Sequence, residues 1–143
     1  MTDLFAGCGT LGLPLLKGLS KLTAAESDTA ALAAMKAAVD AAVLGARLDC
    51  IEADLMRAPL TADLFGDVEA VIIDPPRAGA SAQCEILATT AVPAIAMVSC
   101  NPASFARDAA ILVAGGYRLT SLQIIDQFRF SSHVEIVAGL KRG

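Results

Sequence analysis

Two residues near the C-terminus, Cys100 and Glu135, carry side chains that could act together in one reaction. Cys100 directly follows an apolar run at 95–99 that predicts a buried strand, and Glu135 lies in a later apolar segment at 133–140. A thiolate can add to an electron-poor ring and make the neighbouring carbon nucleophilic. A carboxylate can then remove a proton from that carbon. The pair therefore fits methylation of a carbon that is not itself nucleophilic, such as C5 of uracil.

A glycine-rich turn after the first predicted strand is a candidate binding site for the methyl donor. Gly7, Gly9 and Gly12 match the pattern G-x-G-x-x-G, which NAD enzymes also use. Such glycines let the backbone approach a ligand closely. Asp3 favours S-adenosylmethionine, because its carboxylate is suited to the donor's ammonium group. An NAD-dependent oxidoreductase is the alternative, but it leaves the thiol and carboxylate near the C-terminus without a role.

Three further acids stand at the ends of predicted strands, where parallel sheets bind ligands. Glu26 is placed to accept hydrogen bonds from both ribose hydroxyls of the donor, and Asp54 to reach its adenine amino group. Asp74 opens the string Asp-Pro-Pro-Arg, in which Arg77 can hydrogen-bond a base carbonyl or a phosphate. Solvated acids and a structural Pro-Pro turn are the alternative interpretations.

Strand-like and helix-like periodicities alternate along the chain, which predicts an α/β fold with a mostly parallel sheet. Strands are expected at 2–6, 22–26, 48–53, 70–73, 95–99, 118–125 and 133–140, the last two as an antiparallel pair. Helices are expected at 11–19, from a cap at Asp28 to a stop at Gly45, at 83–90 and at 103–113.

Composition limits the class of protein. A chain of 143 residues, 55% hydrophobic, suits one catalytic domain over 1–143, and no apolar run is long enough to cross a membrane. The four cysteines lack the close pairs of a metal site, so no metal is expected. We expect the cysteines to be reduced thiols in a cytoplasmic protein. The net charge of −4 does not suit a domain that holds nucleic acid alone. Because the chain begins inside its first predicted strand, we expect a C-terminal fragment of a longer protein.

Four strings, in this order along the chain, resemble the S-adenosylmethionine-dependent RNA uracil-C5 methyltransferases. They are Asp3-Leu4-Phe5-Ala6-Gly7-Cys8-Gly9-Thr10, Asp74-Pro75-Pro76-Arg77-Ala78-Gly79, Ser99-Cys100-Asn101-Pro102-Ala103 with Ala106-Arg107-Asp108, and Asp126-Gln127-Phe128 followed by His133-Val134-Glu135. The resemblance implies a Rossmann-like methyltransferase fold with a seven-stranded sheet. It also implies Cys100 as the nucleophile, Glu135 as the general base and Asp74 as a contact to the target uracil. Asp74 is expected to contact the donor as well. Glu26 and Asp54 would hold the donor's nucleoside, with Gly7 near its methionine part.

The resemblance also indicates the RNA partner. The segment around Asn101–Asp108 is closer to the bacterial 23S rRNA branch of the family than to the tRNA branch, which is the alternative. Relatives carry upstream an RNA-binding β-barrel domain and often a four-cysteine iron–sulfur cluster, and Arg129 stands where many have proline. Most of the RNA-gripping surface is therefore expected upstream, with neither a membrane nor an obligate protein partner. A donor-binding module without catalytic activity is the second alternative.

Overall fold

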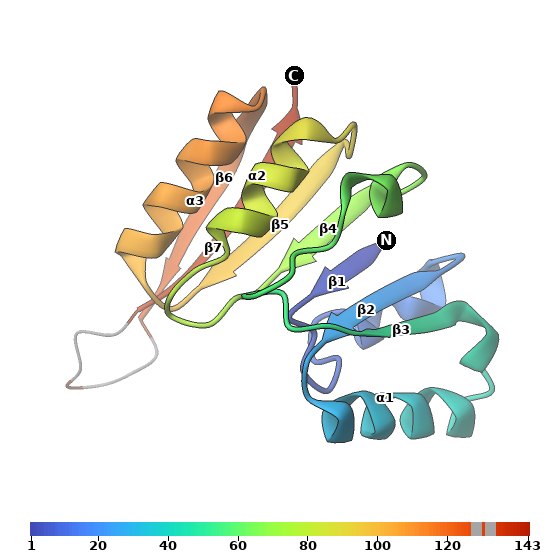
Figure 1. The fold of residues 1–143 in the computed structure, drawn as a ribbon. Coiled ribbons are helices and arrows are strands. Elements are labelled where there is room, and N and C mark those ends of the chain that lie inside the picture. The colour runs from blue at the N-terminus through green and yellow to red at the C-terminus, as the bar shows by residue number, and fades with distance from the viewer. Residues whose placement is uncertain (127–129, 131–133) are drawn as a thin grey trace.

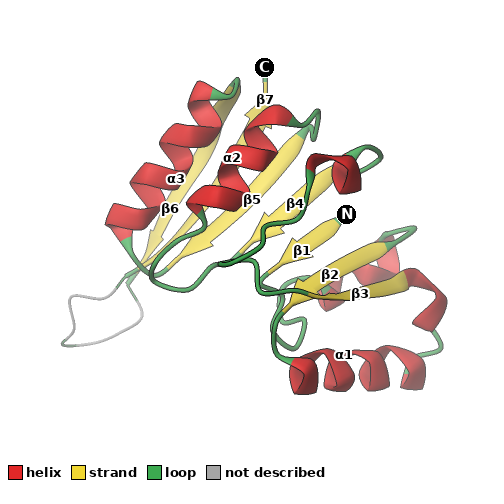
Figure 2. Ribbon diagram, viewed as in Figure 1, coloured by secondary structure: helices red, strands yellow, loops and turns green. Residues whose placement is uncertain are grey.

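The computed structural model describes residues 1–126, 130 and 134–143. Within these residues, seven strands form one sheet in the order β3-β2-β1-β4-β5-β7-β6. The first five strands along the chain pair in parallel, and β7 pairs antiparallel with both β5 and β6. The strands are β1 (Thr2–Leu4), β2 (Leu22–Glu26), β3 (Leu48–Glu52), β4 (Ala70–Ile73), β5 (Ala94–Ser99), β6 (Tyr117–Ile125) and β7 (Glu135–Arg142). The predicted α/β sheet with an antiparallel C-terminal pair is confirmed (Figures 1 and 2).

Helices pack on both faces of this sheet. They are α1 (Thr29–Ala41), α2 (Ser81–Thr89) and α3 (Pro102–Ala114), with short 3-10 helices η1 (Leu13–Gly18), η2 (Gly45–Arg47) and η3 (Ala62–Phe65). Figure 1 shows α2 and α3 side by side over β5, β7 and β6, and α1 beside β2 and β3. Successive strand residues face opposite sides. Accordingly, Ala25 of β2 joins the large core beneath α2 and α3, whereas Ala24 packs with Met35 of α1.

Local sequence explains where α1 begins and ends. The Asp28 carboxylate accepts hydrogen bonds from the backbone amides of Ala30 and Ala31, as predicted for a helix cap. The predicted stop at Gly45 is wrong, because Val43 adopts the left-handed conformation instead, with φ 58°. The amides of Val43 and Leu44 then bond back to the carbonyls of Asp40 and Val39, and the helix ends at Ala41, four residues before the glycine.

The segment after the glycine-rich turn also differs from its prediction. The helix expected at 11–19 is the 3-10 helix η1. Pro14 has no amide hydrogen to donate, and Gly9 and Gly12 favour turns over helix. The strand expected at 2–6 stops at Leu4, because Phe5 turns into the left-handed region at φ 60°. This strained residue starts the turn that forms one wall of the site described next.

Candidate active site

A cavity of about 340 Å³ opens at the carboxyl ends of β1 to β4. This volume lies within the range of small-molecule sites. Its lining residues come from the ends of four strands and the loops that follow them: Phe5, Glu26, Ser27, Ala53, Asp54, Leu55, Met56, Asp74 and Pro76. The predicted donor residues Glu26, Asp54 and Asp74 therefore share one cavity, which has an aromatic ring and aliphatic side chains beside its three carboxyl groups.

Glu26 is fixed at the end of β2 by backbone amides. Its Oε2 accepts the Gly7 amide at 2.9 Å, and its Oε1 accepts the amides of Ser27 and Asp28 at 2.7 and 2.9 Å. Burial acts to raise the pKa of Glu26, but these hydrogen bonds outweigh it and hold the pKa below its ordinary value. Glu26 is thus an ionised acceptor that joins the glycine-rich turn to β2, and its Oε2 keeps room to accept one more hydrogen bond.

The three glycines have different roles. Gly7 has φ 54° and open space where a side chain would begin, as a ligand-facing turn requires. A Cβ at Gly9 would collide with the Leu13 side chain, and a Cβ at Gly12 would collide with Asp3 Oδ2. Only Gly7 therefore has the geometry of a residue that leaves space for a ligand, whereas Gly9 and Gly12 allow close packing inside the protein.

Asp3 lies beneath the turn and does not line the cavity. Its side chain is 1% exposed, and its Oδ2 has no hydrogen-bond partner among the described residues. Burial raises the pKa of Asp3 to about 6, against the hydrogen bond from the Gly12 backbone. The structure thus gives Asp3 a position from which its negative charge and its bond to Gly12 act on the turn.

Asp54 lines the cavity from the loop that follows β3. Its Oδ1 accepts the Met56 amide at 3.1 Å, and its other oxygen lies 3.6 Å from Arg57 Nε.

The fully buried Gln83 of α2 bonds to the backbone of Leu60 through both ends of its side-chain amide: its oxygen accepts from the Leu60 amide, and its nitrogen donates to the Leu60 carbonyl. Sequence reasoning missed Gln83, because a polar residue inside a helix gives no signal of a partner more than twenty positions away.

The strand register brings Cys100 and Glu135 to the same end of the sheet. The last pair of the ladder between β5 and β7 is Ser99 with Ile136. Cys100 is the residue after Ser99 and Glu135 is the residue before Ile136, so both stand at this end of the ladder. Both are half-buried. The sequence distance between the thiol and the carboxylate is thus closed by the pairing of β7 with β5.

Asp74 lies between this pair and the cavity at the ends of β1 to β4. Partial burial raises the pKa of Asp74, and the negative charge of Glu135 raises it further. The Asp74 carboxyl also contributes, after burial, to the raised pKa of Asp3. Three carboxyl groups on β1, β4 and β7 therefore lie near enough to influence one another. Such a site favours a positively charged ligand.

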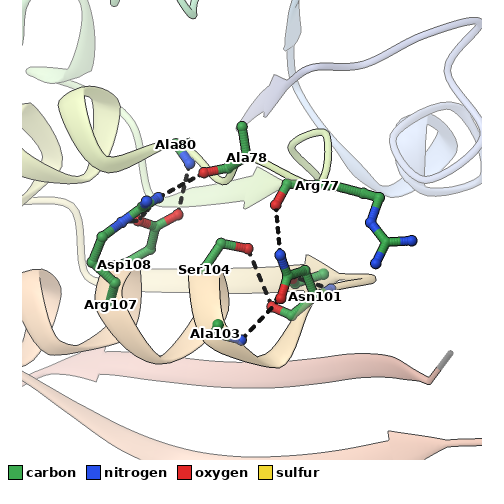
Figure 3. Close-up of polar contacts among 9 residues, drawn as sticks. Arg77, Ala78, Ala80, Asn101, Ala103, Ser104, Arg107 and Asp108 are labelled. Atoms are coloured by element: carbon green, nitrogen blue, oxygen red, sulfur yellow. Dashed lines mark hydrogen bonds and ion pairs between the residues drawn. The ribbon is translucent and has the colours of Figure 1, made fainter. Parts of the chain in front are cut away.

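Hydrogen bonds shape the turn that carries Cys100. The Ser99 hydroxyl contacts both the backbone amide and the carbonyl of Asn101, each at 3.2 Å, and so spans the cysteine. The Asn101 side chain caps α3 through the Ala103 amide and donates to the Arg77 carbonyl at 3.0 Å (Figure 3). Figure 3 also shows the Arg77 guanidinium pointing away from these contacts.

The remaining cysteines have surroundings that differ from that of Cys100. Burial raises the pKa of Cys84 on α2 to about 12, and it raises that of Cys50 on β3 above its ordinary value. A thiol with a raised pKa is a poor source of thiolate. Cys8 is exposed in the glycine-rich turn.

The described residues contain no cluster of three or more His, Cys, Asp and Glu side chains placed to hold a metal ion. None of the described helices is long and apolar enough to cross a membrane.

Two sequence predictions fall beyond this description. His133, for which the sequence allows either a role in orienting Glu135 or contacting phosphate or a packing or capping role, lies outside the described residues, as does Arg129. In the structure the last strand begins at Glu135 and runs to Arg142.

The family model described as tRNA (uracil-5-)-methyltransferase matches residues 60–142. The chain belongs to this family. The matched span includes Asp74, Arg77, Cys100 and Glu135, four of the residues that the sequence patterns singled out. The resemblance stated from the four strings is confirmed, and so is the methyltransferase fold.

Individual relatives of this uracil methyltransferase family agree. An RNA methyltransferase of Mesorhizobium japonicum is 44% identical over 99% of the chain and 34% of its own length. The 23S rRNA (uracil(1939)-C(5))-methyltransferase RlmD of Halomonas elongata is 38% identical over 93% of the chain and 28% of its own. The crystal structure of Pyrococcus abyssi tRNA (uracil-54, C5)-methyltransferase with S-adenosyl-L-homocysteine superposes with a TM-score of 0.80 at 30% identity, over 97% of the chain and 33% of that protein. The chain thus spans about a third of the length of the relatives it matches.

Proposed function

We propose that this domain transfers a methyl group from S-adenosylmethionine to C5 of a uridine in RNA, through a covalent bond between Cys100 and C6 of the base. The observation that supports the proposal is the antiparallel pairing of β5 with β7, because Cys100 and Glu135 adjoin its last pair and the charge of Glu135 acts on Asp74. Thiol, base and donor cavity meet at one end of one sheet.

The cavity suits the proposed donor in shape and charge. Glu26 is ionised and can accept a ribose hydroxyl, Asp54 stands where an adenine amino group can donate to it, and Phe5 offers an apolar wall. The carboxyl groups of Asp3 and Asp74 favour the positive charges that distinguish S-adenosylmethionine from a neutral nucleoside. When bound, the donor supplies a methyl group activated by a positively charged sulfur.

The chain's own residues perform the remaining chemistry. The Cys100 thiolate adds to C6 of uracil, and the ring electrons move onto O4 and C5, which makes C5 nucleophilic. Once C5 has gained the methyl group, Glu135 removes the C5 proton. The C6–S bond then breaks, the double bond between C5 and C6 returns, and the thiolate leaves. Asp74 and Arg77 contact the base, which must be unpaired or flipped out to reach the thiol.

The substrate proposed is 23S rRNA, with tRNA as the competing RNA. The family description and the Pyrococcus abyssi relative name tRNA, whereas the Halomonas elongata relative names 23S rRNA. The chain carries a net charge of −4, so the main positive surface for gripping either RNA is proposed to lie outside this domain. Methylation of matched rRNA and tRNA fragments would distinguish the two substrates.

A covalent trap tests the mechanism. RNA containing 5-fluorouridine should form an adduct with the protein that survives a denaturing gel, because a base cannot remove fluorine from C5 as it removes a proton. The Glu135→Gln variant should accumulate the same adduct on ordinary RNA, whereas Cys100→Ala should form none. An adduct that persists in Cys100→Ala would exclude Cys100 as the nucleophile.

A donor-binding module without catalysis is the second candidate, favoured by the fact that the chain spans about a third of its relatives. Calorimetric titration with S-adenosylhomocysteine, with NAD as the control, separates the possibilities. Binding of S-adenosylhomocysteine without any methylation or adduct would support the module. Tighter binding of NAD would contradict both proposals and favour an oxidoreductase.

A further inference from the structure

Helix α3 grips the loop that follows β4. From α3 and its cap, Asn101 donates to the Arg77 carbonyl at 3.0 Å, Arg107 Nη2 donates to the Ala78 carbonyl at 2.9 Å, and Asp108 Oδ2 accepts the Ala80 amide at 2.6 Å (Figure 3). Three backbone groups within four consecutive loop residues are thus bonded to one helix. We call this set of contacts the α3 clamp.

Arg107 and Asp108 form the centre of the clamp. The Arg107 guanidinium contacts Asp108 Oδ1 through Nε at 2.8 Å and through Nη2 at 2.7 Å. Asp108 is only 1% exposed, whereas about half of the Arg107 side chain is open to solvent. A buried carboxylate is strongly unfavourable without partners, and here both of its oxygens have them. The loop amide and the guanidinium together satisfy this buried charge.

Gly79 shows how closely the loop approaches the clamp. Its φ is +79°, and a Cβ built on it would collide with Arg107 Nη2, Asp108 Oδ2 and the Ser104 side chain. The loop backbone therefore lies directly against the charged pair, in a conformation that favours glycine.

The same helix also carries the turn of the proposed nucleophile. Helix α3 begins at Pro102, immediately after Cys100 and the Asn101 cap. The loop held by α3 begins at Asp74, directly after β4, and includes Arg77. A helix turn is stiff compared with a loop. Holding the loop on α3 thus sets Asp74 and Arg77 relative to Cys100 independently of the pairing between β4 and β5.

We propose that Arg107 and Asp108 are positioning residues for methyl transfer, which hold the uracil-contacting loop at a fixed distance from the Cys100 turn. This inference rests on the proposed function and adds to it two residues that do not line the cavity. Misplacement of catalytic groups by about 1 Å can slow a reaction about a hundredfold. Loss of the clamp should therefore reduce the rate of the chemical step more than it reduces binding.

The test compares Arg107→Gln and Asp108→Asn with the matched control Lys21→Gln. Arg107 is half-exposed, so its replacement removes little packing, although it takes one partner from the buried Asp108. Asp108→Asn keeps an oxygen for the Ala80 amide. Lys21 forms an exposed ion pair with Asp49 at 2.6 Å, which lies at the amino ends of β2 and β3, away from the site. Each protein is assayed for hydrogen exchange of the amides at 77–80, for kcat and KM on uridine RNA, and for S-adenosylhomocysteine affinity.

Both clamp variants should exchange the Ala80 amide faster and lose about tenfold or more in kcat, with KM and donor affinity near those of the unchanged chain. Arg107→Lys should recover part of the lost kcat, because an ammonium group can reach one of the two oxygen partners but not bridge both. Lys21→Gln should change none of these values. Faster exchange with an unchanged kcat, or unchanged exchange in both variants, would overturn the positioning role.

The clamp and the proposed function can fail separately. If the unchanged chain transfers no methyl group, the proposed function is contradicted, and the clamp is judged by the rate at which iodoacetamide alkylates Cys100, followed by mass spectrometry of its peptide. The clamp variants should then alter that rate at least severalfold while Lys21→Gln does not. Equal rates in all four proteins would overturn the inference.

Discussion

Carboxyl groups in two parts of the site, the end of β2 and the region of β1 and β4, have pKa shifts of opposite direction. At the end of β2, backbone amides surround Glu26 and hold its pKa below the ordinary value, so this carboxylate is ionised and well satisfied. At the ends of β1 and β4, burial and neighbouring negative charge raise the pKa of Asp3 and Asp74. The same kind of side chain thus has pKa shifts of opposite direction on neighbouring strands of one sheet.

This difference indicates a division of labour. A carboxylate that is already satisfied can hold neutral hydroxyl groups without disturbing the fold. Carboxyl groups that are poorly compensated gain most from a cation, because the cation removes the cost of their charge. We therefore propose that the β2 end holds the donor's ribose, and that the carboxyl groups of Asp3 and Asp74 favour its charged sulfur and ammonium. Perturbed titration of this kind is typical of functional sites.

The largest expected effect separates catalysis from binding. Cys100→Ala should lower the rate of methyl transfer by about a thousandfold or more, because no other group can form the bond to C6. Its affinity for S-adenosylhomocysteine should not change, because Cys100 does not line the donor cavity. The matched control is Cys50→Ala, on β3, which should keep the activity. Substantial methylation by Cys100→Ala would show that the two ends are not divided as proposed.

Glu26→Gln tests the satisfied end. The variant should bind S-adenosylhomocysteine about 10 to 100 times more weakly, because hydrogen bonds to a charged acceptor are stronger than those to an amide. Its neighbour across the sheet, Glu52 of β3, supplies the control Glu52→Gln, which removes a carboxylate that does not line the cavity. Calorimetric titration measures both. Equal affinities in the two variants would argue against a ribose contact at Glu26.

Asp3→Asn tests the buried carboxyl group of β1. This substitution should increase the free energy of unfolding. Burial raises the pKa of Asp3 from 3.8 to about 6, so the folded state binds a proton more readily than the unfolded state. Stability should therefore fall as the pH rises through this range, and the variant should lack that fall. At pH 7 the substitution should add about 1–2 kcal/mol to the free energy of unfolding.

Urea unfolding between pH 4 and pH 8 measures this effect, and Glu26 gives the contrast. Because the pKa of Glu26 is lowered, its contribution to stability is present above the ordinary pKa of the group and is lost as the pH falls. A loss of stability at pH 7 in Asp3→Asn would mean that the bond from Gly12 outweighs the burial cost.

Val43→Gly gives the smallest effect and lies outside both ends. Val43 has a left-handed backbone and a side chain that is 91% exposed, so replacement relieves strain without removing buried contacts. We expect a gain of about 1 kcal/mol in the free energy of unfolding, measured in urea, with donor affinity unchanged. A change in donor affinity would mean that α1 influences the cavity, and the comparison of the two ends would need to include it.

The sequence was most informative where interactions are local. The cap at Asp28, the bounds of β2 and β4, and the strand-end positions of Glu26 and Asp74 all follow from short patterns and agree with the structure. The stop at Gly45 failed because the hydrogen bonds of the last turn hold Val43 in the strained conformation, with its side chain exposed.

Long-range partners could not be read from the sequence. Arg107 and Asp108 belong to a recognised string, but nothing in that string says that they bind the backbone of residues 78 and 80. Gln83 bonds to Leu60 through the core in the same way. The antiparallel pair of β6 and β7 was predicted. The sequence did not predict that β7, the later strand of the two, lies between β5 and β6.

That inserted strand has a consequence for the order of events during synthesis. β7 comprises residues Glu135–Arg142 at the end of the chain, and it fills an interior place in the sheet. A nascent chain emerges from its N-terminus, at about 5 to 20 residues per second. The residues of the cavity and the thiol are thus made before Glu135, the proposed base. The two proposed catalytic groups cannot come together until β7 has joined the sheet.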